Sequence, residues 1–271
     1  MIKIENVTYG YKKGVNVLKN INVEIKDKET VVIVGKNGSG KSTLGKIISG
    51  IIRPKEGKIL IDNLSLLDKK NKEEIRKKIG IVFQNPENQI IFNSVADEVS
   101  FALKDLEEDE VKQRIEESLR KVHMEDKINE DLYELSLGQK QRIVISEVLA
   151  KQPKYIVFDE PTTMIDSKGK EKIYHIVEDL KKDGYTILYI TNMAEEILLA
   201  DRIIILENGR IAEEMTKQEL LNKLEVLEQY DIKIPILLEV IHGLKKEGIN
   251  IDLKDYSVEE LVTKLKEIIR K

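Results

Sequence analysis

Apolar and polar positions along the chain follow two different periods, which predicts alternating strands and helices. Continuously apolar segments, or apolar residues alternating with polar ones, are typical of strands, whereas an apolar residue every three or four positions is typical of a helix. The segments with strand character are 2–8, 21–25, 31–34, 58–61, 79–83, 155–158, 186–190, 202–206 and 210–212. The segments with helical character are 41–51, 109–122, 136–149 and 168–182. This order predicts an α/β fold with a largely parallel sheet.

The C-terminal part of the chain has another pattern. Three helical segments, near 216–224, 235–246 and 257–269, replace the alternation of strands and helices. We therefore expect a main domain over 1–215 and a helical annex over 216–271, too small to fold on its own. The apolar stripes of the annex fit either a surface for a partner or a core packed back onto the main domain.

Composition narrows the classes of function. The 271 residues carry a formal net charge of −4, without the clustered basic excess of a nucleic-acid-binding surface. The absence of cysteine excludes disulfides and thiolate metal sites. The first residues lack the apolar core of a signal peptide, and no run of about 18 apolar residues occurs. We expect no nucleic-acid partner and no bilayer span, so that any membrane role depends on a partner.

A phosphate-binding loop is the strongest motif in the sequence. The stretch from Gly35 to Ser42 follows an apolar strand and fits G-x-x-x-x-G-K-[ST]. Its glycines let consecutive N–H groups surround an anion, and the following helix start favours negative charge. Lys41 can reach the β- and γ-phosphates of a nucleotide, and the Ser42 hydroxyl can bind Mg²⁺. The expected nucleotide contacts are Gly35, Asn37, Gly38, Ser39, Gly40, Lys41, Ser42 and Thr43.

A tyrosine near the N-terminus is a candidate for base recognition. Tyr9 and Tyr11 precede a turn, where an aromatic ring either fills the end of a strand or stacks on a nucleotide base. Tyr9 shares a strand face with Val7, so Tyr11 is the better candidate for stacking.

Two adjacent carboxylates end the apolar strand 155–158. Successive strand residues point in opposite directions, so Asp159 and Glu160 are expected to have different tasks. A carboxylate that faces the phosphate loop holds Mg²⁺, and its neighbour can polarise a water molecule. Simple solvent exposure explains an acid pair after a fully apolar strand poorly.

Two further polar segments lie where a strand ends and a helix begins. Gln84 is expected to be the first residue beyond its strand, at the sheet edge where open α/β sheets bind ligands, so its amide oxygen can reach a metal or a water; the alternative is an ordinary loop. Ser136, followed by Gly138 and Gln139, opens a helix. Ser136 is therefore either a plain N-cap or part of a second anion-binding helix start.

Taken in order, these motifs resemble the ATPase subunit of an ABC transporter over residues 2 to about 215. The resemblance implies a P-loop NTPase fold with a mostly parallel core sheet, an N-terminal antiparallel β part and an α-helical subdomain that carries the signature motif. It also implies that two subunits dimerise head to tail. Each of two ATP molecules then lies between the phosphate loop of one subunit and the signature of the other.

The same resemblance implies roles for individual residues. Tyr11 is expected to stack on adenine, while Lys41, Ser42 and Thr43 hold phosphates and Mg²⁺. Gln84 is expected to sense Mg²⁺ and the attacking water, and to couple the site to the membrane partner.

The remaining expected roles lie later in the chain. Ser136 and Gly138, with Gln139 beside them, are expected to clamp the γ-phosphate held by the other subunit. Asp159 would support Mg²⁺, and Glu160 would be the general base. Asp166 would lie in the loop that joins the two sites.

Other segments resemble a narrower group, the energy-coupling-factor (ECF) importers of vitamins and of cobalt or nickel. The segments are Phe83–Gln89, Ser94–Phe101 and, in the tail, Ile234–Leu238, Leu244–Ile249 and Val258–Val262. In that group the C-terminal segment helps to hold two ATPases together. We therefore expect a peripheral ATPase on the cytoplasmic face of the cell membrane that uses ATP and Mg²⁺ and works with integral membrane subunits.

Two positions depart from the family pattern. Leu137 stands where the signature usually has glycine, and Asn192 stands where the pattern has histidine. Asparagine can donate a hydrogen bond to a γ-phosphate but carries no charge. Weaker hydrolysis at this chain's own phosphate site is expected, which favours a non-identical partner ATPase over a homodimer. The alternatives are another kind of ABC transporter, such as an exporter, and a non-transport ABC protein that binds nucleotide with weak hydrolysis.

Overall fold

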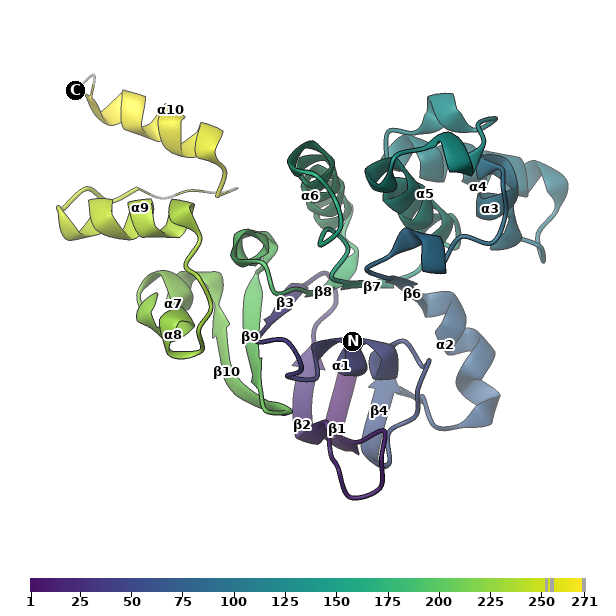
Figure 1. Ribbon diagram of the computed structural model, residues 1–271, viewed down its shortest axis with the longest axis horizontal. Coiled ribbons are helices and arrows are strands. Elements are labelled where there is room, and N and C mark those ends of the chain that lie inside the picture. The colour runs from purple at the N-terminus through teal and green to yellow at the C-terminus, as the bar shows by residue number, and fades with distance from the viewer. Residues whose placement is uncertain (252, 254–255, 270–271) are drawn as a thin grey trace.

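The computed structural model describes residues 1–251, 253 and 256–269. The positions 252, 254–255 and 270–271 of the expected annex lie outside the described residues. Figure 1 shows two sheets that meet near the centre of the molecule, a group of helices beyond one edge of the larger sheet and the C-terminal helices beyond the other. Within the described part of the chain, every helix is too short or too polar to cross a bilayer.

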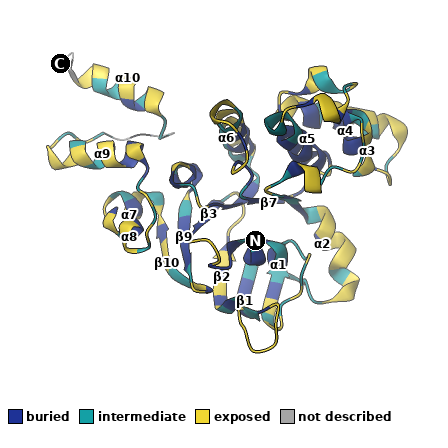
Figure 2. Ribbon diagram, in the orientation of Figure 1, coloured by how far each residue is buried: buried dark blue, intermediate teal, exposed yellow. Residues whose placement is uncertain are grey.

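The larger sheet has six strands in the order β10-β9-β3-β8-β7-β6. Its strands are β3 (Thr30–Val34), β6 (Ile79–Val82), β7 (Tyr155–Asp159), β8 (Thr186–Ile190), β9 (Arg202–Glu207) and β10 (Arg210–Thr216). All neighbouring pairs are parallel except β9 and β10. Every residue of β3, β7 and β8 is buried (Figure 2), as expected for a parallel sheet covered on both faces. The largely parallel core sheet is therefore confirmed.

The smaller sheet is antiparallel and has the order β2-β1-β4-β5. Its strands are β1 (Ile2–Tyr9), β2 (Leu18–Ile25), β4 (Glu56–Ile61) and β5 (Leu64–Ser65). Its buried side chains form one core with helix α1 (Lys41–Ile48) and one face of the larger sheet. Alternate residues of β3 serve the two faces, since Val31 and Ile33 belong to this core and Val32 and Val34 belong to the core on the other side.

The second core lies under α3 (Val95–Phe101), α4 (Glu108–Lys121), α5 (Leu137–Ala150) and α6 (Ser167–Lys182). Helix α2 (Lys72–Lys78) instead contributes Ile75 to the first core. Short 3₁₀ turns occupy Lys69–Asn71, Pro86–Asn88, Glu125–Lys127, Leu132–Glu134 and Ala194–Leu199. Helices α3, α4 and α5 form a separate group beyond the β6 edge of the sheet (Figure 1), which confirms the expected helical subdomain.

The described part of the annex contains α7 (Lys217–Leu221), α8 (Glu225–Gln229), α9 (Ile236–Lys246) and α10 (Val258–Ile269). Thr216 caps α7 through a reciprocal capping box with Glu219. Apolar residues from all four of these helices, Leu220, Leu227, Leu238 and Leu261 among them, belong to the same hydrophobic cluster as the main domain. Part of the apolar surface of the annex is therefore packed back into that core, whereas side chains such as Ile236 and Val258 stay exposed.

Several expected element boundaries were wrong. The helix expected over 41–51 ends at Ile48, because Ser49 caps it and Gly50 takes a left-handed φ of 74°. Strand β6 ends at Val82, which makes Gln84 the second residue beyond the sheet. The sequence pattern also did not predict β5, α2, α3 or α8, which are too short for a clear period.

Candidate functional site

The phosphate loop lies between β3 and α1 in a conformation that requires glycine. A Cβ atom on Gly35 would lie 2.2 Å from the carbonyl oxygen of Leu206, and Gly40 has a φ of 108°. The loop is also tied to the β9–β10 turn, because the N–H of Gly209 donates a hydrogen bond to the carbonyl of Ser39 at 3.1 Å. Close packing therefore positions the loop at the end of the central strand.

Lys41 is buried within this loop, with 4% of its surface exposed. Its Nζ donates hydrogen bonds to the carbonyl oxygens of Gly35 at 2.7 Å and Lys36 at 3.1 Å. Burial lowers the pKa of Lys41, while the negative charges of Glu160 and Asp159 act in the opposite direction. A buried ammonium group held only by neutral carbonyls fits a site that receives an anion.

Asp159 ends β7 as a buried carboxylate that lacks full hydrogen bonding. Its Oδ1 has no hydrogen-bond partner among the described residues. Burial raises the pKa of Asp159, whereas a hydrogen bond from the Ser42 hydroxyl and the charges of Lys46 and Lys41 oppose the rise. Buried oxygen atoms of this kind usually bind a water molecule or an ion. A carboxylate oxygen beside a hydroxyl fits Mg²⁺, which prefers oxygen ligands and keeps several waters.

Glu160 leaves the strand in a different direction from Asp159. Its φ of 51° is in the left-handed region, which is uncommon for residues other than glycine. Its N–H donates to the carbonyl of Ile190 at 2.9 Å, and its carboxylate accepts a hydrogen bond from the Thr163 hydroxyl at 3.4 Å. The two acids therefore occupy different environments, and Glu160 stays more accessible than Asp159.

Tyr11 reaches the phosphate loop from the β1–β2 connection. Its hydroxyl lies 3.2 Å from Thr43 Oγ1, and 60% of its surface is exposed. The ring of Tyr9 packs edge-on against it, with centroids 5.1 Å apart. Tyr11 therefore presents an open aromatic face beside the loop, whereas Tyr9 packs partly into the core.

Gln84 is exposed in the loop that follows β6. The loop itself is held by side-chain amides, because Gln89 accepts from the N–H of Phe83 at 3.3 Å and donates to the carbonyl of Ile81 at 3.2 Å. Gln141 of α5 also donates to the carbonyl of Phe83 at 2.9 Å. These bonds connect the Gln84 segment to the helix that begins at the signature motif.

The signature motif forms a complete helix cap. Gln139 N–H donates to Ser136 Oγ at 3.3 Å, and Ser136 N–H donates to Gln139 Oε1 at 2.9 Å. A Cβ on Gly138 would lie 3.2 Å from Ile165. Among the described residues, no hydrogen bond or ion pair joins this motif to the phosphate loop. The structure thus brings Tyr11, the phosphate loop and the acid pair together, but not the signature.

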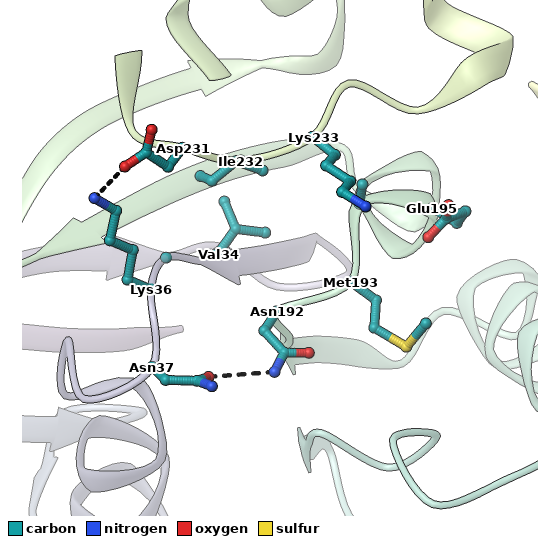
Figure 3. Close-up of a pocket in the computed structure, with 11 residues that line it drawn as sticks. Val34, Lys36, Asn37, Asn192, Met193, Glu195, Asp231, Ile232 and Lys233 are labelled. Carbon is teal, nitrogen blue, oxygen red and sulfur yellow. Dashed lines mark hydrogen bonds and ion pairs between the residues drawn. The ribbon is translucent and has the colours of Figure 1, made fainter. Parts of the chain in front are cut away.

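Asn192 follows β8 and lies beside the phosphate loop. Its amide donates a hydrogen bond to Asn37 Oδ1 at 3.3 Å, drawn as a dashed line in Figure 3. Both residues line a pocket of about 590 Å³. The residues around this pocket are Val34, Gly35, Lys36, Asn37, Asn192, Met193, Ala194, Glu195, Asp231, Ile232 and Lys233.

The annex contributes one wall of that pocket, which the sequence did not reveal. Asp231 forms an ion pair with Lys36 of the phosphate loop (Figure 3), and this contact raises the pKa of Lys36. Asp231 also takes a left-handed φ of 54°. Nothing in the local pattern identifies a contact between residues this far apart in the chain.

Sequence comparisons relate the chain to a known family. The profile of the family described as ABC transporter matches residues 18–163. The energy-coupling factor transporter ATP-binding protein EcfA1 of Clostridioides difficile (strain 630) is 36% identical, over 98% of this chain and 98% of the relative. The protein of the same name from Mesomycoplasma hyopneumoniae (strain 7448) is 42% identical, over 90% of this chain and 92% of the relative.

Solved structures show the same similarity in three dimensions. The cbiO1 structure from Clostridium perfringens, described as part of the ABC transporter complex cbiONQ, is 34% identical with a TM-score of 0.77, covering 88% of this chain and 97% of that one. A dimeric ATP-binding cassette in a post-hydrolysis state with ADP and Pi is 36% identical with a TM-score of 0.72, covering 80% and 98%.

Proposed function

The chain belongs to the ABC transporter family as an ATP-hydrolysing subunit, and we propose that it energises an ECF-type importer of vitamins or of cobalt or nickel. The observation that carries the proposal is that the phosphate loop and the acid pair, Asp159 and Glu160, lie together at one edge of the sheet. The full-length similarity to the two EcfA1 relatives supports the ECF type.

Each site residue is proposed to have one role in ATP binding or hydrolysis. Lys41 and the loop N–H groups hold the phosphates, and Tyr11 stacks on the base. When bound, Mg²⁺ held by Ser42, Asp159 and Gln84 would neutralise charge on the phosphates. Glu160 orients the attacking water and accepts its proton.

A second ATPase is proposed to complete each site. Ser136 caps α5, and Gly138 and Gln139 lie in its first turn. Helix α5 belongs to the group beyond the β6 edge of the sheet, apart from α1, which follows the phosphate loop (Figure 1), so a second subunit is needed to bring a signature to this loop. The similarity to a dimeric cassette supports this arrangement. We propose a non-identical partner, because Asn192 weakens this chain's own phosphate site; a homodimer is the alternative. Integral membrane subunits contacted near Gln84 would hold the complex at the cytoplasmic face of the membrane.

The transport proposal is tested by isolating the complex from membranes with a tag on this chain. Integral membrane subunits should co-purify, and ATP-dependent uptake of a vitamin or of cobalt or nickel should require them. Recovery of this chain without any membrane protein would contradict the transport proposal. It would favour the alternative of a non-transport protein that binds nucleotide and hydrolyses it weakly, as Asn192 leads us to expect.

Asn192→His is expected to raise ATP turnover at the site built on this chain's phosphate loop. An added electrostatic contact to the γ-phosphate is worth roughly 3 kcal/mol, or about a hundredfold in rate, when it acts in the transition state. The measurement is steady-state hydrolysis by the lone chain and by the assembled complex. Asn192→Ala serves as the control and should not accelerate hydrolysis. If the lone wild-type chain already matches the complex and the histidine changes nothing, the proposal of unequal sites is wrong.

Exposed apolar side chains on the last two annex helices are proposed to contact the partner ATPase. The side chains with the largest exposure are Ile236, Val240, Val258, Val262 and Ile268. We propose the annex, residues 216–271, as a dimerisation segment beside the ATP-binding domain of residues 1–215.

Val240→Glu combined with Val262→Glu is expected to weaken ATPase–ATPase association about tenfold or more, because a charge would be buried without a partner. Sedimentation with ATP measures this effect. Glu267→Lys, a charge change at an exposed position of α10 away from the Val258 and Val262 side, is the control and should dimerise normally. An unaltered dimer in the double variant would show that this face does not contact the partner.

A further inference from the structure

A fully buried carboxylate lies near the sheet edge that carries the acid pair. The proposed hydrolysis of ATP assigns it no role. Glu196 is in the 3₁₀ turn Ala194–Leu199, and only 1% of its surface is exposed. Burying a carboxylate is costly unless hydrogen bonds satisfy it. The groups that donate hydrogen bonds to Glu196 therefore indicate which segments it connects.

The hydroxyls of Thr162, Tyr189 and Thr191 donate hydrogen bonds to Glu196, and the Tyr174 hydroxyl of α6 also interacts with it. Oε1 accepts from the hydroxyls of Thr162 and Tyr189, the latter at 2.8 Å, and Oε2 accepts from the Thr191 hydroxyl. Thr162, Tyr189 and Thr191 are all at most 1% exposed. Burial raises the pKa of Glu196, and the hydrogen bonds from the surrounding hydroxyls oppose that rise.

Two of these donors belong to the loops that carry the proposed catalytic groups. Thr162 lies two residues after Glu160, in the connection between β7 and α6. Thr191 directly precedes Asn192, and its hydroxyl also accepts the N–H of Met193 at 2.9 Å. The two oxygens of one carboxylate therefore connect the general-base loop to the Asn192 segment.

We propose that Glu196 is a positioning residue that sets the separation between Glu160 and Asn192 during ATP hydrolysis. This inference rests on the proposed function, because it requires that these two residues act on ATP. Glu196 itself is buried and acts only through the two threonine hydroxyls. Small displacements of reacting groups cost up to about a hundredfold in rate, so a rigid connection between the loops affects turnover.

The neighbouring hydroxyls allow a matched test in the full-length chain, alone and in its complex. Thr162→Val and Thr191→Val keep side-chain shape but remove one donor each, whereas Thr162→Ser and Thr191→Ser keep the donor. Tyr189→Phe removes a donor that comes from the core of β8 and joins neither loop. The measurements are kcat and KM for ATP, ATP affinity by calorimetry and the midpoint of thermal unfolding.

Each valine variant is expected to lower kcat about tenfold or more, with KM and ATP affinity changed by less than about twofold. The serine variants and Tyr189→Phe should keep kcat within about twofold of the wild type. If a valine variant unfolds below the assay temperature, Glu196→Gln replaces it and should show the same loss of kcat with ATP affinity retained.

Two results would overturn the inference while leaving the proposed function intact: wild-type kcat in both valine variants, or an equal loss of kcat in Tyr189→Phe. The second result would indicate a general packing role for the hydrogen bonds to Glu196. Failure of the wild-type chain and its complex to bind or hydrolyse ATP would instead overturn the proposed function itself.

Discussion

Glu160→Gln is expected to lower ATP hydrolysis about 10²-fold or more while ATP binding is retained, the usual scale for loss of a general base. Glutamine keeps the shape of the side chain and its hydrogen bond to Thr163 but cannot accept the proton of the attacking water. Asp159 and Glu160 occupy separate environments, so the substitution should leave the buried Asp159 in place. The loss of hydrolysis then reports on Glu160 alone. The ATP-bound dimer should also last longer, since hydrolysis no longer separates the subunits.

Turnover is measured in the assembled complex, and ATP affinity is measured by calorimetry. Glu171→Gln makes the same chemical change at an exposed position of α6 and should leave turnover unchanged. Near-normal hydrolysis by Glu160→Gln would show that another group accepts the proton.

Lys41→Ala should abolish hydrolysis and weaken ATP binding about 10²-fold or more, because the phosphates lose a charge held in a site that excludes water. Burial lowers the pKa of Lys41, so its charged form is costly in the folded chain, and this cost offsets part of the stability lost with its hydrogen bonds to Gly35 and Lys36. Thermal unfolding of the variant separates weaker ATP binding from loss of the fold.

Calorimetry with ATP and thermal unfolding together measure these two effects. Lys172→Ala, which removes an exposed lysine of α6, should leave both quantities unchanged. Unchanged ATP affinity in Lys41→Ala would remove the phosphate loop from the proposed mechanism.

Much of the core was predictable, because its signals are local. The apolar strands β3, β7 and β8 were expected within one residue of their observed ends. The helices α4 and α6 were equally clear, since each is long enough to show its period. Short elements such as β5 and α8 escaped prediction because two to five residues show no reliable period.

By itself the sequence determined the features that depend on neighbouring residues. The glycines of the phosphate loop, the acid pair at the end of β7 and the capping box of Ser136 and Gln139 follow from backbone conformation and hydrogen bonds within a few residues. Such local preferences are present in the sequence before any tertiary packing forms, so the residues of the candidate site could be located without a structure.

Only the tertiary structure decided which distant segments meet. The ion pair of Lys36 with Asp231 and the hydrogen bonds of Glu196 to Thr162 join residues on different elements. No periodicity specifies such partners, because each polar side chain has many equivalent candidates in the sequence. Packing of the helices against the parallel sheet selects one of them. Glu196 is buried, so it must find its hydrogen bonds where the fold provides them, whereas the exposed Lys36 and Asp231 meet because the annex lies beside the phosphate loop.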